Sequence, residues 1–269
     1  MSAVPTAITH PTTRDVAPIG PMLWRQTRAE FLKLWRNPGF SIVSLALPAI
    51  FFAFFGLPNA HYQEGAVSAG RYILASFAAY GVISVMLFSF GVGVAVERSQ
   101  RMNVLLRATP LRPIVYLGAK VLTALVFALL MLLILFAFGA IAGGIRMDAG
   151  MWLVLTGRLL LGALPFIALG FAVGYLASPN AAAPIIQILF LILSFASGLF
   201  IPMQQLPSFI QKIAPYLPTY RYGQFAWNAI GYDIKEPLSA PTLWLLGYGI
   251  VFVVIAVRAY RREDQKSFG

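Results

Sequence analysis

A polar, basic stretch between two long apolar runs is the part of the chain best suited to bind a partner. It covers residues 97–113 and carries four arginines beside three consecutive aliphatic residues at 104–106. Pro110 and Pro113 limit any helix within it to about two turns. A loop that only has to be soluble does not need exposed aliphatics. The pattern indicates a docking loop that contacts another subunit or this protein's own helices; alternatively, its arginines only set the orientation of the chain in a membrane.

The other reactive side chains do not form a catalytic pattern. The chain has no cysteine, and its two histidines, His10 and His61, lie in the N-terminal segment and after the first apolar run. An intramembrane hydrolase needs a nucleophile and a base, or paired acids, within the bilayer, and no carboxylate lies in the middle of an apolar run. The sequence also lacks the Gly-x-x-x-x-Gly-Lys-Ser/Thr loop that binds nucleotide phosphates. We therefore expect no enzymatic activity, no ATP hydrolysis and no bound cofactor or metal in this chain.

Composition indicates that these residues belong to a membrane protein. Hydrophobic residues make up 59% of the chain and charged residues 11%, whereas soluble proteins are roughly a quarter charged. A bilayer core requires about 20 apolar residues per helix, and the apolar runs are continuous rather than alternating as in a membrane barrel. The sequence thus predicts an all-α, polytopic protein with six transmembrane helices. The expected spans are 40–57, 72–96, 115–141, 152–177, 181–201 and 243–257.

The basic residues predict the orientation of these spans. Six spans place both termini on one side, and 14 of the 20 lysines and arginines then lie on that side. Because short cytoplasmic loops are rich in Lys and Arg, we expect cytoplasmic termini and a location in the inner (plasma) membrane. The same distribution accounts for the formal net charge of +11 through contacts with anionic lipid, without a nucleic-acid partner.

The N-terminal part of the chain contains two distinct segments. Residues 1–20 are rich in proline and lack an apolar run, so we expect a disordered leader rather than a cleaved signal peptide, followed by a single transmembrane domain over 21–269. Residues 22–36 form an amphipathic pattern typical of a helix lying on the membrane, as an interfacial anchor or also as a contact for a cytoplasmic partner. Its apolar side holds Trp24, Phe31 and Trp35, and its polar half holds Arg25, Gln26, Glu30, Lys33 and Arg36.

Two further features concern the opposite side of the membrane. Residues 202–230 are too apolar for a free loop and too often broken by proline for a span, so we expect short re-entrant helices that dip into the outer leaflet. Arg158 is a strong charge inside a span, about two turns from its outer start at Trp152. We expect Arg158 to snorkel outward or to pair with Asp148, or else to contact a substrate.

Three blocks of sequence, taken in order and with their spacing, resemble one family. The first is Thr-Arg-Ala-Glu-Phe-Leu-Lys at 27–33 with Arg-Asn-Pro at 36–38, and the second is Glu97-Arg98 with Leu-Leu-Arg-Ala-Thr-Pro-Leu at 105–111. The third is Ser-Gly-Leu-Phe-Ile-Pro at 197–202, followed by Leu206-Pro207 and Ile-Ala-Pro-Tyr-Leu-Pro at 213–218. From Met22 to the C-terminus the chain is similar to ABC transporter type-2 permease subunits, the membrane half of an ATP-driven exporter.

The resemblance implies partners that the chain itself does not contain. A separate ABC ATPase subunit would bind ATP and magnesium, and a second permease copy, identical or not, would complete the substrate pathway. The ATPase would dock on residues Glu97, Arg98, Arg101, Leu105, Leu106, Arg107 and Arg112.

The resemblance also implies where a substrate would pass. The second and fifth spans would line the route through Phe77, Tyr80, Met86, Phe88, Gln187, Ser194 and Phe195, and an outer gate would include Phe200, Pro202, Leu206 and Phe209. Large, soft and aromatic side chains suit a hydrophobic or amphipathic compound such as a drug, a lipid or a glycan-lipid, although in membrane spans they also serve packing and lipid contact. The outer segment could equally serve only to pack over the spans. The alternative function is an ATP-independent channel or a proton-coupled carrier, which would need a ring or relay of ionisable groups.

Overall fold

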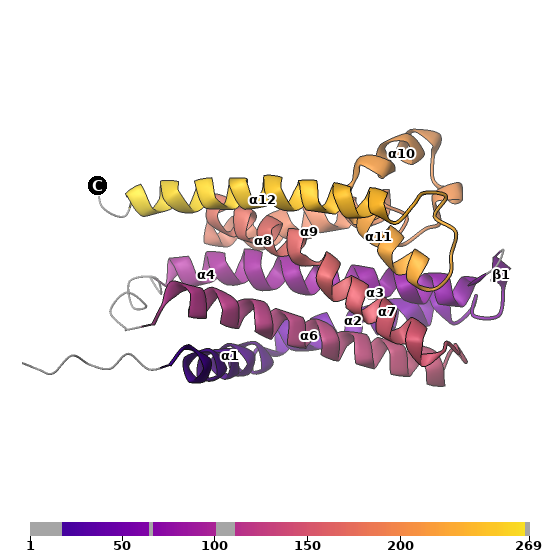
Figure 1. The fold of residues 1–269 in the computed structure, drawn as a ribbon, viewed down its shortest axis with the longest axis horizontal. Helices are drawn as coiled ribbons and strands as arrows, with labels where there is room; N and C mark the ends of the chain where they lie inside the picture. The colour runs from indigo at the N-terminus through magenta and orange to yellow at the C-terminus, as the bar shows by residue number, and fades with distance from the viewer. Residues whose placement is uncertain (1–17, 65–66, 101–110, 267–269) are drawn as a thin grey trace, which may run out of the picture.

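The apolar runs form long helices, as their length and composition predict (Figure 1). The computed structural model describes residues 18–64, 67–100 and 111–266. Within these residues, six helices are long and apolar enough to cross a membrane: Pro38–Gly56, Ala69–Ser99, Pro113–Ile141, Ala149–Leu176, Pro179–Ala196 and Ser239–Glu263. The predicted all-α fold with six spans is therefore confirmed. The fifth span ends at Ala196 rather than at 201, because Gly198 turns the chain with a φ of 78° that favours glycine.

The helices follow one another in a simple order along the chain. The first half contains α1 (Ile19–Trp35), α2 (Pro38–Phe51), the π-helix η1 (Phe52–Gly56), α3 (Ala69–Leu87), the π-helix η2 (Phe88–Val92), α4 (Gly93–Ser99) and α6 (Pro113–Ile141). The second half contains α7 (Ala149–Gly162), α8 (Leu164–Leu176), α9 (Pro179–Ala196), η3 (Met203–Gln205), α10 (Ser208–Ile213), η4 (Ala214–Tyr216), α11 (Pro218–Ala229) and α12 (Ser239–Lys266). A short antiparallel hairpin, β1 (Gln63–Glu64) and β2 (Val67–Ser68), pairs Gln63 with Ser68 and Glu64 with Val67.

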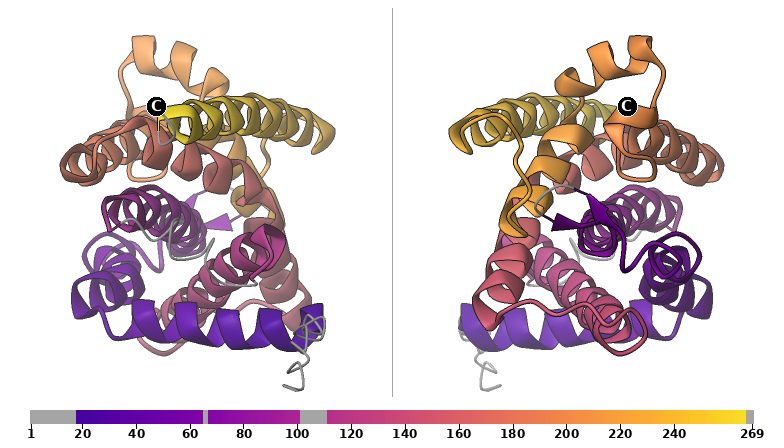
Figure 2. Two further views of the ribbon diagram at one scale, coloured as in Figure 1. Left: turned by 90° about the vertical axis from the view of Figure 1, so that its left-hand side faces the viewer. Right: turned by 90° about the vertical axis from the view of Figure 1, so that its right-hand side faces the viewer.

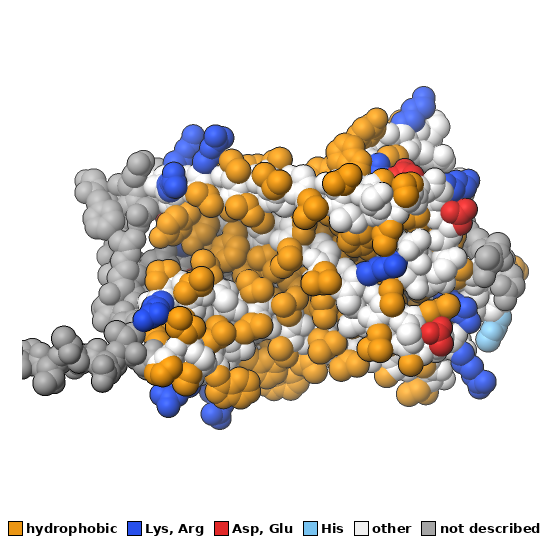
Figure 3. All heavy atoms as spheres, in the orientation of Figure 1, with side chains coloured by type: hydrophobic (Ala, Val, Ile, Leu, Met, Phe, Trp, Pro, Cys, Tyr) orange, Lys and Arg blue, Asp and Glu red, His pale blue; other side chains and the backbone are white. Residues whose placement is uncertain are grey.

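The spans lie side by side in a bundle with two distinct ends (Figures 1 and 2). We call the end that contains α1, the end of α4, the start of α6 and the C-terminal part of α12 the terminal end, and the end that contains β1, β2, α10 and α11 the hairpin end. α1 runs crosswise to the spans at the terminal end, as Figure 2 shows. Figure 3 shows hydrophobic side chains over the middle of the visible face and Lys and Arg side chains toward both ends. This distribution is what a bilayer between the two ends requires.

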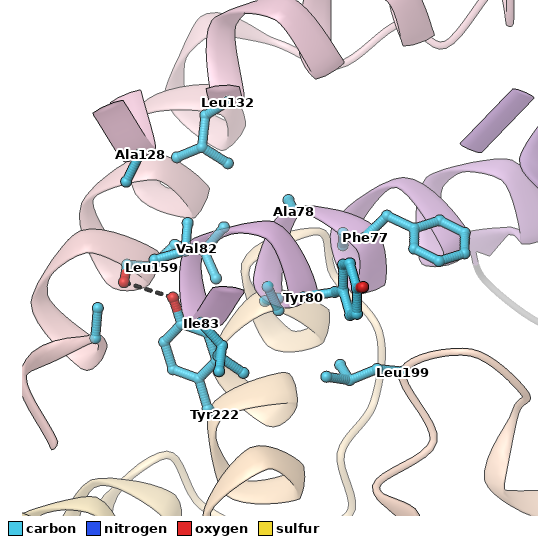
Figure 4. Close-up of a cluster of buried hydrophobic side chains, with 14 of the residues drawn as sticks. Phe77, Ala78, Tyr80, Val82, Ile83, Ala128, Leu132, Leu159, Leu199 and Tyr222 are labelled. Atoms are coloured by element: carbon cyan, nitrogen blue, oxygen red, sulfur yellow. Dashed lines mark hydrogen bonds between the residues drawn. The ribbon is translucent and has the colours of Figure 1, made fainter. Parts of the chain in front are cut away.

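Span 2, formed by α3, η2 and α4, is the core of the bundle. In an apolar 18-residue stretch of span 2, 78% of the residues are buried, compared with 11% in the corresponding stretch of span 6 and 22% in that of span 5. Figure 4 shows residues of α3, among them Val82 and Ile83, packed against α6, α7 and α11. Any movement of span 2 must therefore displace the helices that pack around it, because close-packed interiors transmit strain.

A π-helical segment interrupts span 2 where α8 comes very close. A Cβ added to Gly174 of α8 would lie 2.9 Å from the carbonyl oxygen of Gly91, and one added to Gly170 of α8 would lie 3.3 Å from the amide nitrogen of Gly91. Glycine therefore permits backbone contact between η2 and α8 that other residues would prevent. π-helical turns are uncommon and often occur at functional positions.

The stretch at 202–230 forms η3, α10, η4 and α11, with prolines at each break. Its last helix, α11, is anchored in the bundle: the Tyr222 hydroxyl is buried and donates a hydrogen bond to the carbonyl of Leu159 at 2.6 Å (Figure 4). The expected short helices are thus present. That they dip into the outer leaflet stays a prediction.

Candidate functional site

A cluster of charges joins α1, α4 and α6 at the terminal end; its members are buried or half-buried except Lys33, whose side chain is 45% exposed. Glu97, in the last turn of α4, is only 5% exposed. Its carboxylate accepts a hydrogen bond from Lys120 Nζ of α6 at 2.6 Å, and further hydrogen bonds from Lys33 Nζ of α1 and from the hydroxyl of Tyr116. One carboxylate thus binds three side chains from two neighbouring helices.

A second carboxylate completes the cluster. Glu30 of α1 lies 2.7 Å from Lys33 Nζ and 3.3 Å from Lys120 Nζ. With Glu97 the cluster contains two negative and two positive charges. Burying ions costs several kcal/mol each unless they are paired and hydrogen-bonded, and this arrangement balances the charge. We call Glu30, Lys33, Glu97, Tyr116 and Lys120 the ion cluster.

Helical spacing explains how the sequence builds the ion cluster. Glu30 and Lys33 are three residues apart on α1, and Tyr116 and Lys120 are four residues apart on α6, so each pair lies on one face of its helix. Glu30, predicted on the polar half of this helix, is only 8% exposed, because that side of α1 packs against α6. Trp24 and Trp35, predicted on the apolar side, are exposed on the outside of the bundle, as the lipid-facing side of an interfacial helix would be.

Arg98, the neighbour of Glu97, binds the opposite side of the bundle. Its Nη1 donates to the carbonyls of Gly174 at 2.7 Å, Tyr175 at 3.0 Å and Ala177 at 3.3 Å, at the C-terminal end of α8. Its Nη2 lies 2.6 Å from Glu263 Oε1 of α12. The last carbonyls of a helix have no intrahelical partner and carry partial negative charge, so a guanidinium caps α8 and ties it to α4 and α12.

We expect Arg98→Gln to weaken this connection. The shorter, neutral amide cannot reach the three carbonyls and Glu263 together, and the loss of hydrogen bonds from a charged group costs roughly 2 kcal/mol. The purified variant should therefore melt at a lower temperature than wild type. Arg262→Gln removes an exposed positive charge one residue before Glu263 and should leave the melting temperature unchanged. A wild-type melting temperature for Arg98→Gln would contradict the assigned role.

Lys33 carries the measurable pH dependence of the ion cluster. Burial disfavours its charged form, but the carboxylates of Glu97 and Glu30 outweigh this effect and raise the pKa of Lys33 above its ordinary value of 10.5. A raised pKa contributes stability that is fully present below the unfolded value and is lost as the pH rises through the folded value.

We expect the difference in melting temperature between wild type and Lys33→Met to stay constant from neutral pH to about pH 10 and to decline at higher pH. Measuring the difference isolates Lys33 from the tyrosines and other lysines that titrate in the same range. If the difference in melting temperature instead grew above pH 10.5, the pKa of Lys33 would be lowered rather than raised by folding. That result would exclude the pairing of Lys33 with Glu97 and Glu30.

The ends of the predicted docking loop lie at these contacts. Glu97 and Arg98 stand at its start, and Arg112, exposed, is the N-cap residue of α6 at its end. The other predicted docking residues, Arg101, Leu105, Leu106 and Arg107, lie outside the described residues. The described ends of the loop are therefore fixed to the bundle through α4 and α6.

A second cluster brings together predicted pathway and gate residues. Phe200 stacks on Phe195 with ring centroids 4.5 Å apart, and it meets Tyr80 edge-on at 5.0 Å and Phe77 at 5.3 Å. Phe51, at the end of α2, lies 5.2 Å from Phe200 as well. Three predicted pathway residues thus contact one predicted gate residue. We call these five residues the aromatic cluster.

The remaining predicted residues are dispersed. Met86 and Ser194 are buried inside the chain, Phe88 is half-buried, and Gln187 is exposed on α9. Of the gate residues, Pro202 and Leu206 are half-buried, and Phe209 is exposed on α10. Their roles in a pathway or gate stay predictions.

Arg158 has a different partner from the one expected. Its Nη1 donates to Asn228 Oδ1 of α11 at 2.6 Å. Asp148 does not pair with it; its carboxylate instead caps α7 by accepting from the Met151 amide at 3.0 Å. Arg158 therefore links span 4 to α11.

Four members of the ion cluster, namely Glu30, Lys33, Tyr116 and Lys120, were not predicted as site residues. One signal was available: Lys120 is a charge inside the third apolar run, and such a charge needs a partner. Among the described residues, no group of three His, Cys, Asp or Glu is arranged to hold a metal ion.

The six membrane-length helices define a polytopic membrane protein. Paired charges at one end join several of these helices to the start of the loop at 97–113. Comparison with known proteins identifies it more closely: residues 44–258 match the ABC-2 family transporter protein model, and the chain belongs to this family. It is similar to the Bacillus subtilis (strain 168) protein named "Putative transport permease YvfS", with 29% identity over 244 residues that cover 90% of this chain and 98% of that protein. The predicted family is confirmed, and the chain is a membrane transport permease.

Proposed function

We propose that this permease is the membrane subunit of an ATP-driven exporter and that a separate ABC ATPase docks on the loop at 97–113. The observation that carries the proposal is the placement of Glu97 and Arg98. They stand where span 2 enters the loop, and their side chains bind α1 and α6 on one side and α8 and α12 on the other. A loop needed only for topology would not require such connections.

These contacts suggest how the loop would drive transport. When the ATPase pair closes on nucleotide, a displacement of the loop would shift the end of α4. Glu97 would pass this shift to α1 and α6, and Arg98 would pass it to α8 and α12. The bundle would then rock between inward and outward openings, because packed interfaces change between discrete arrangements rather than deform continuously. This chain would supply binding and movement, and the ATPase would bind ATP and magnesium.

The terminal end supports the proposed orientation. α1 lies crosswise there, with Trp24 and Trp35 exposed beside the exposed cations Arg25, Arg28 and Arg36. Aromatic rings with adjacent cations are typical of the boundary between lipid and cytoplasm. We therefore place both termini in the cytoplasm and the chain in the inner (plasma) membrane.

Spans 1 and 5 are sparsely buried, as span 6 is, and because they border the same region they favour a second permease copy on their side. In an apolar 18-residue stretch of each span, only 28% of the residues of span 1 and 22% of those of span 5 are buried within the chain. Phe55 of η1 and Phe195 of α9 both contact Phe200, so the two spans border the same region of the bundle. A second copy along this side would cover both spans and place the aromatic cluster near the interface between copies.

The character of this side agrees with a hydrophobic or amphipathic substrate, such as a drug, a lipid or a glycan-lipid. Aromatic rings offer apolar contact area, and the exposed amide of Gln187 on α9 offers a polar group within an apolar surface.

The first test is purification of the tagged chain from its native membranes in a mild detergent. We expect an ATPase with a phosphate-binding loop to be recovered in stoichiometric amount. Recovery of the permease alone, even after gentle crosslinking, would contradict the proposal and favour the channel or proton-coupled carrier.

A further inference from the structure

At the hairpin end, a cavity of about 270 Å³ lies between two connections of the chain. One connection joins spans 1 and 2 and contributes His61 and Ser68, and the other joins spans 3 and 4 and contributes Gly144 and Arg146; Arg71 projects from the first turn of α3. Among the residues that the structure describes, none that lines the cavity is acidic. The lining therefore combines two guanidinium groups, an imidazole and a hydroxyl group.

Backbone contacts hold the two connections in place. A Cβ on Gly70 would lie 2.8 Å from the Cα of Ala60, so the first connection lies directly against the start of α3. In the second connection Gly144 has a φ of 62°, and the Ile145 amide returns to the Gly139 carbonyl at 3.1 Å. These backbone contacts thus fix the positions from which the lining side chains extend.

The polar groups of the cavity retain unused donors. Arg71 uses Nη2 to donate to the Arg146 carbonyl at 2.7 Å, which joins the two connections. The Ser68 hydroxyl oxygen accepts from the Arg71 amide at 3.4 Å, so its proton remains available. Arg146 is exposed, and in the described part of the chain no side chain pairs with its guanidinium.

We propose that this cavity binds a phosphate group. Guanidinium groups bind phosphate oxygens in a forked, charge-assisted geometry, and a cavity of this volume accommodates a phosphate with a small substituent. Its position at the start of span 2 and just after the end of span 3 is where the apolar part of the bundle ends. Lipid headgroup phosphates lie at that level of a membrane, and free phosphate reaches it from the aqueous side.

The test uses the purified full chain in a nonionic detergent and measures binding of dioctanoyl phosphatidic acid. Dioctanoylglycerol has the same acyl chains without the phosphate and should not bind at this site. We expect Arg146→Gln and Arg71→Gln each to weaken binding at least about tenfold, because each removes a charge-assisted pair with the phosphate. Lys212→Gln removes an exposed cation from α10 at the same end and should have less than about a twofold effect.

Competition with inorganic phosphate distinguishes the two sources. Displacement of the lipid by inorganic phosphate would show that the phosphate group alone suffices, and failure of displacement would assign the site to a lipid headgroup. Wild-type affinity in both arginine variants, or equal binding of dioctanoylglycerol, would overturn the proposal. Arg146 is exposed and its side chain supports no described contact, so Arg146→Gln remains informative even where Arg71→Gln fails to fold.

Discussion

Glu97→Gln is expected to abolish transport while the ATPase still binds, because Glu97 is 5% exposed and its carboxylate faces the ion cluster rather than the docking surface. The amide keeps the size of the side chain and an acceptor for Tyr116, but within the described chain it leaves Lys33 and Lys120 with Glu30 as their only paired carboxylate. Removing one partner of a buried ion pair typically costs about 3–5 kcal/mol. We expect a clear fall in melting temperature and, at temperatures where the variant is folded, a loss of transport of roughly a hundredfold or more. Transport into vesicles and ATPase recovery measure the two effects separately.

Glu30→Gln is the matched control, because it removes the same charge from the same cluster without touching span 2. It should lower the melting temperature, whereas transport should be less affected. Combining Glu97→Gln with Lys120→Met restores the charge balance and should recover stability but not transport, and the coupling between the two sites follows from the double-mutant cycle. Normal transport by Glu97→Gln would rule out the ion cluster as the connection between loop and bundle.

Leu105→Asp is expected to abolish transport by a different route. If the aliphatic residues at 104–106 are buried against the ATPase, an aspartate there must be desolvated without a partner. Central interface residues often contribute 2 kcal/mol or more, which is about thirtyfold in affinity. The ATPase should then no longer co-purify, while the isolated permease keeps its wild-type melting temperature.

Thr109→Asp adds the same charge to the same loop without replacing an aliphatic residue, and it should transport normally. A well-expressed Leu105→Asp protein with normal transport and normal ATPase recovery would remove the docking proposal. The two variants therefore separate contact with the ATPase from transmission into the bundle: Leu105→Asp loses the partner, and Glu97→Gln keeps the partner but loses its effect.

The spans could be predicted from the sequence because each depends on a local property. A run of about 20 apolar residues has few alternatives to a membrane helix. The short helices near 202–230 were also predictable, since proline breaks act on their immediate neighbours. The positions of Glu97 and Arg98 beside the loop followed from the same local reading.

The partners of these residues could not be predicted, because they depend on how distant helices meet. Lys33 is 64 positions from Glu97, and Gly174 is 76 positions from Arg98. The helical pattern of α1 identified an apolar side facing lipid, but Glu30 lies on a third side that faces α6. Likewise, hydrophobicity did not distinguish Phe77, buried in the core, from Phe195, exposed on α9, because core and lipid select the same residue types.

The π-helical segment η2 determines where the charges at the end of span 2 point. Each residue of an α-helix advances the chain by about 100°, and a π-helical turn inserts one additional residue. Everything after 88–92 is therefore rotated relative to a straight continuation of α3. Glu97 and Arg98 lie about one and a half turns beyond η2, so the directions in which they point, toward α6 and α8, depend on this rotation. The number of residues in η2, more than their chemical nature, thus decides toward which helices Glu97 and Arg98 point and therefore to which helices the loop is attached.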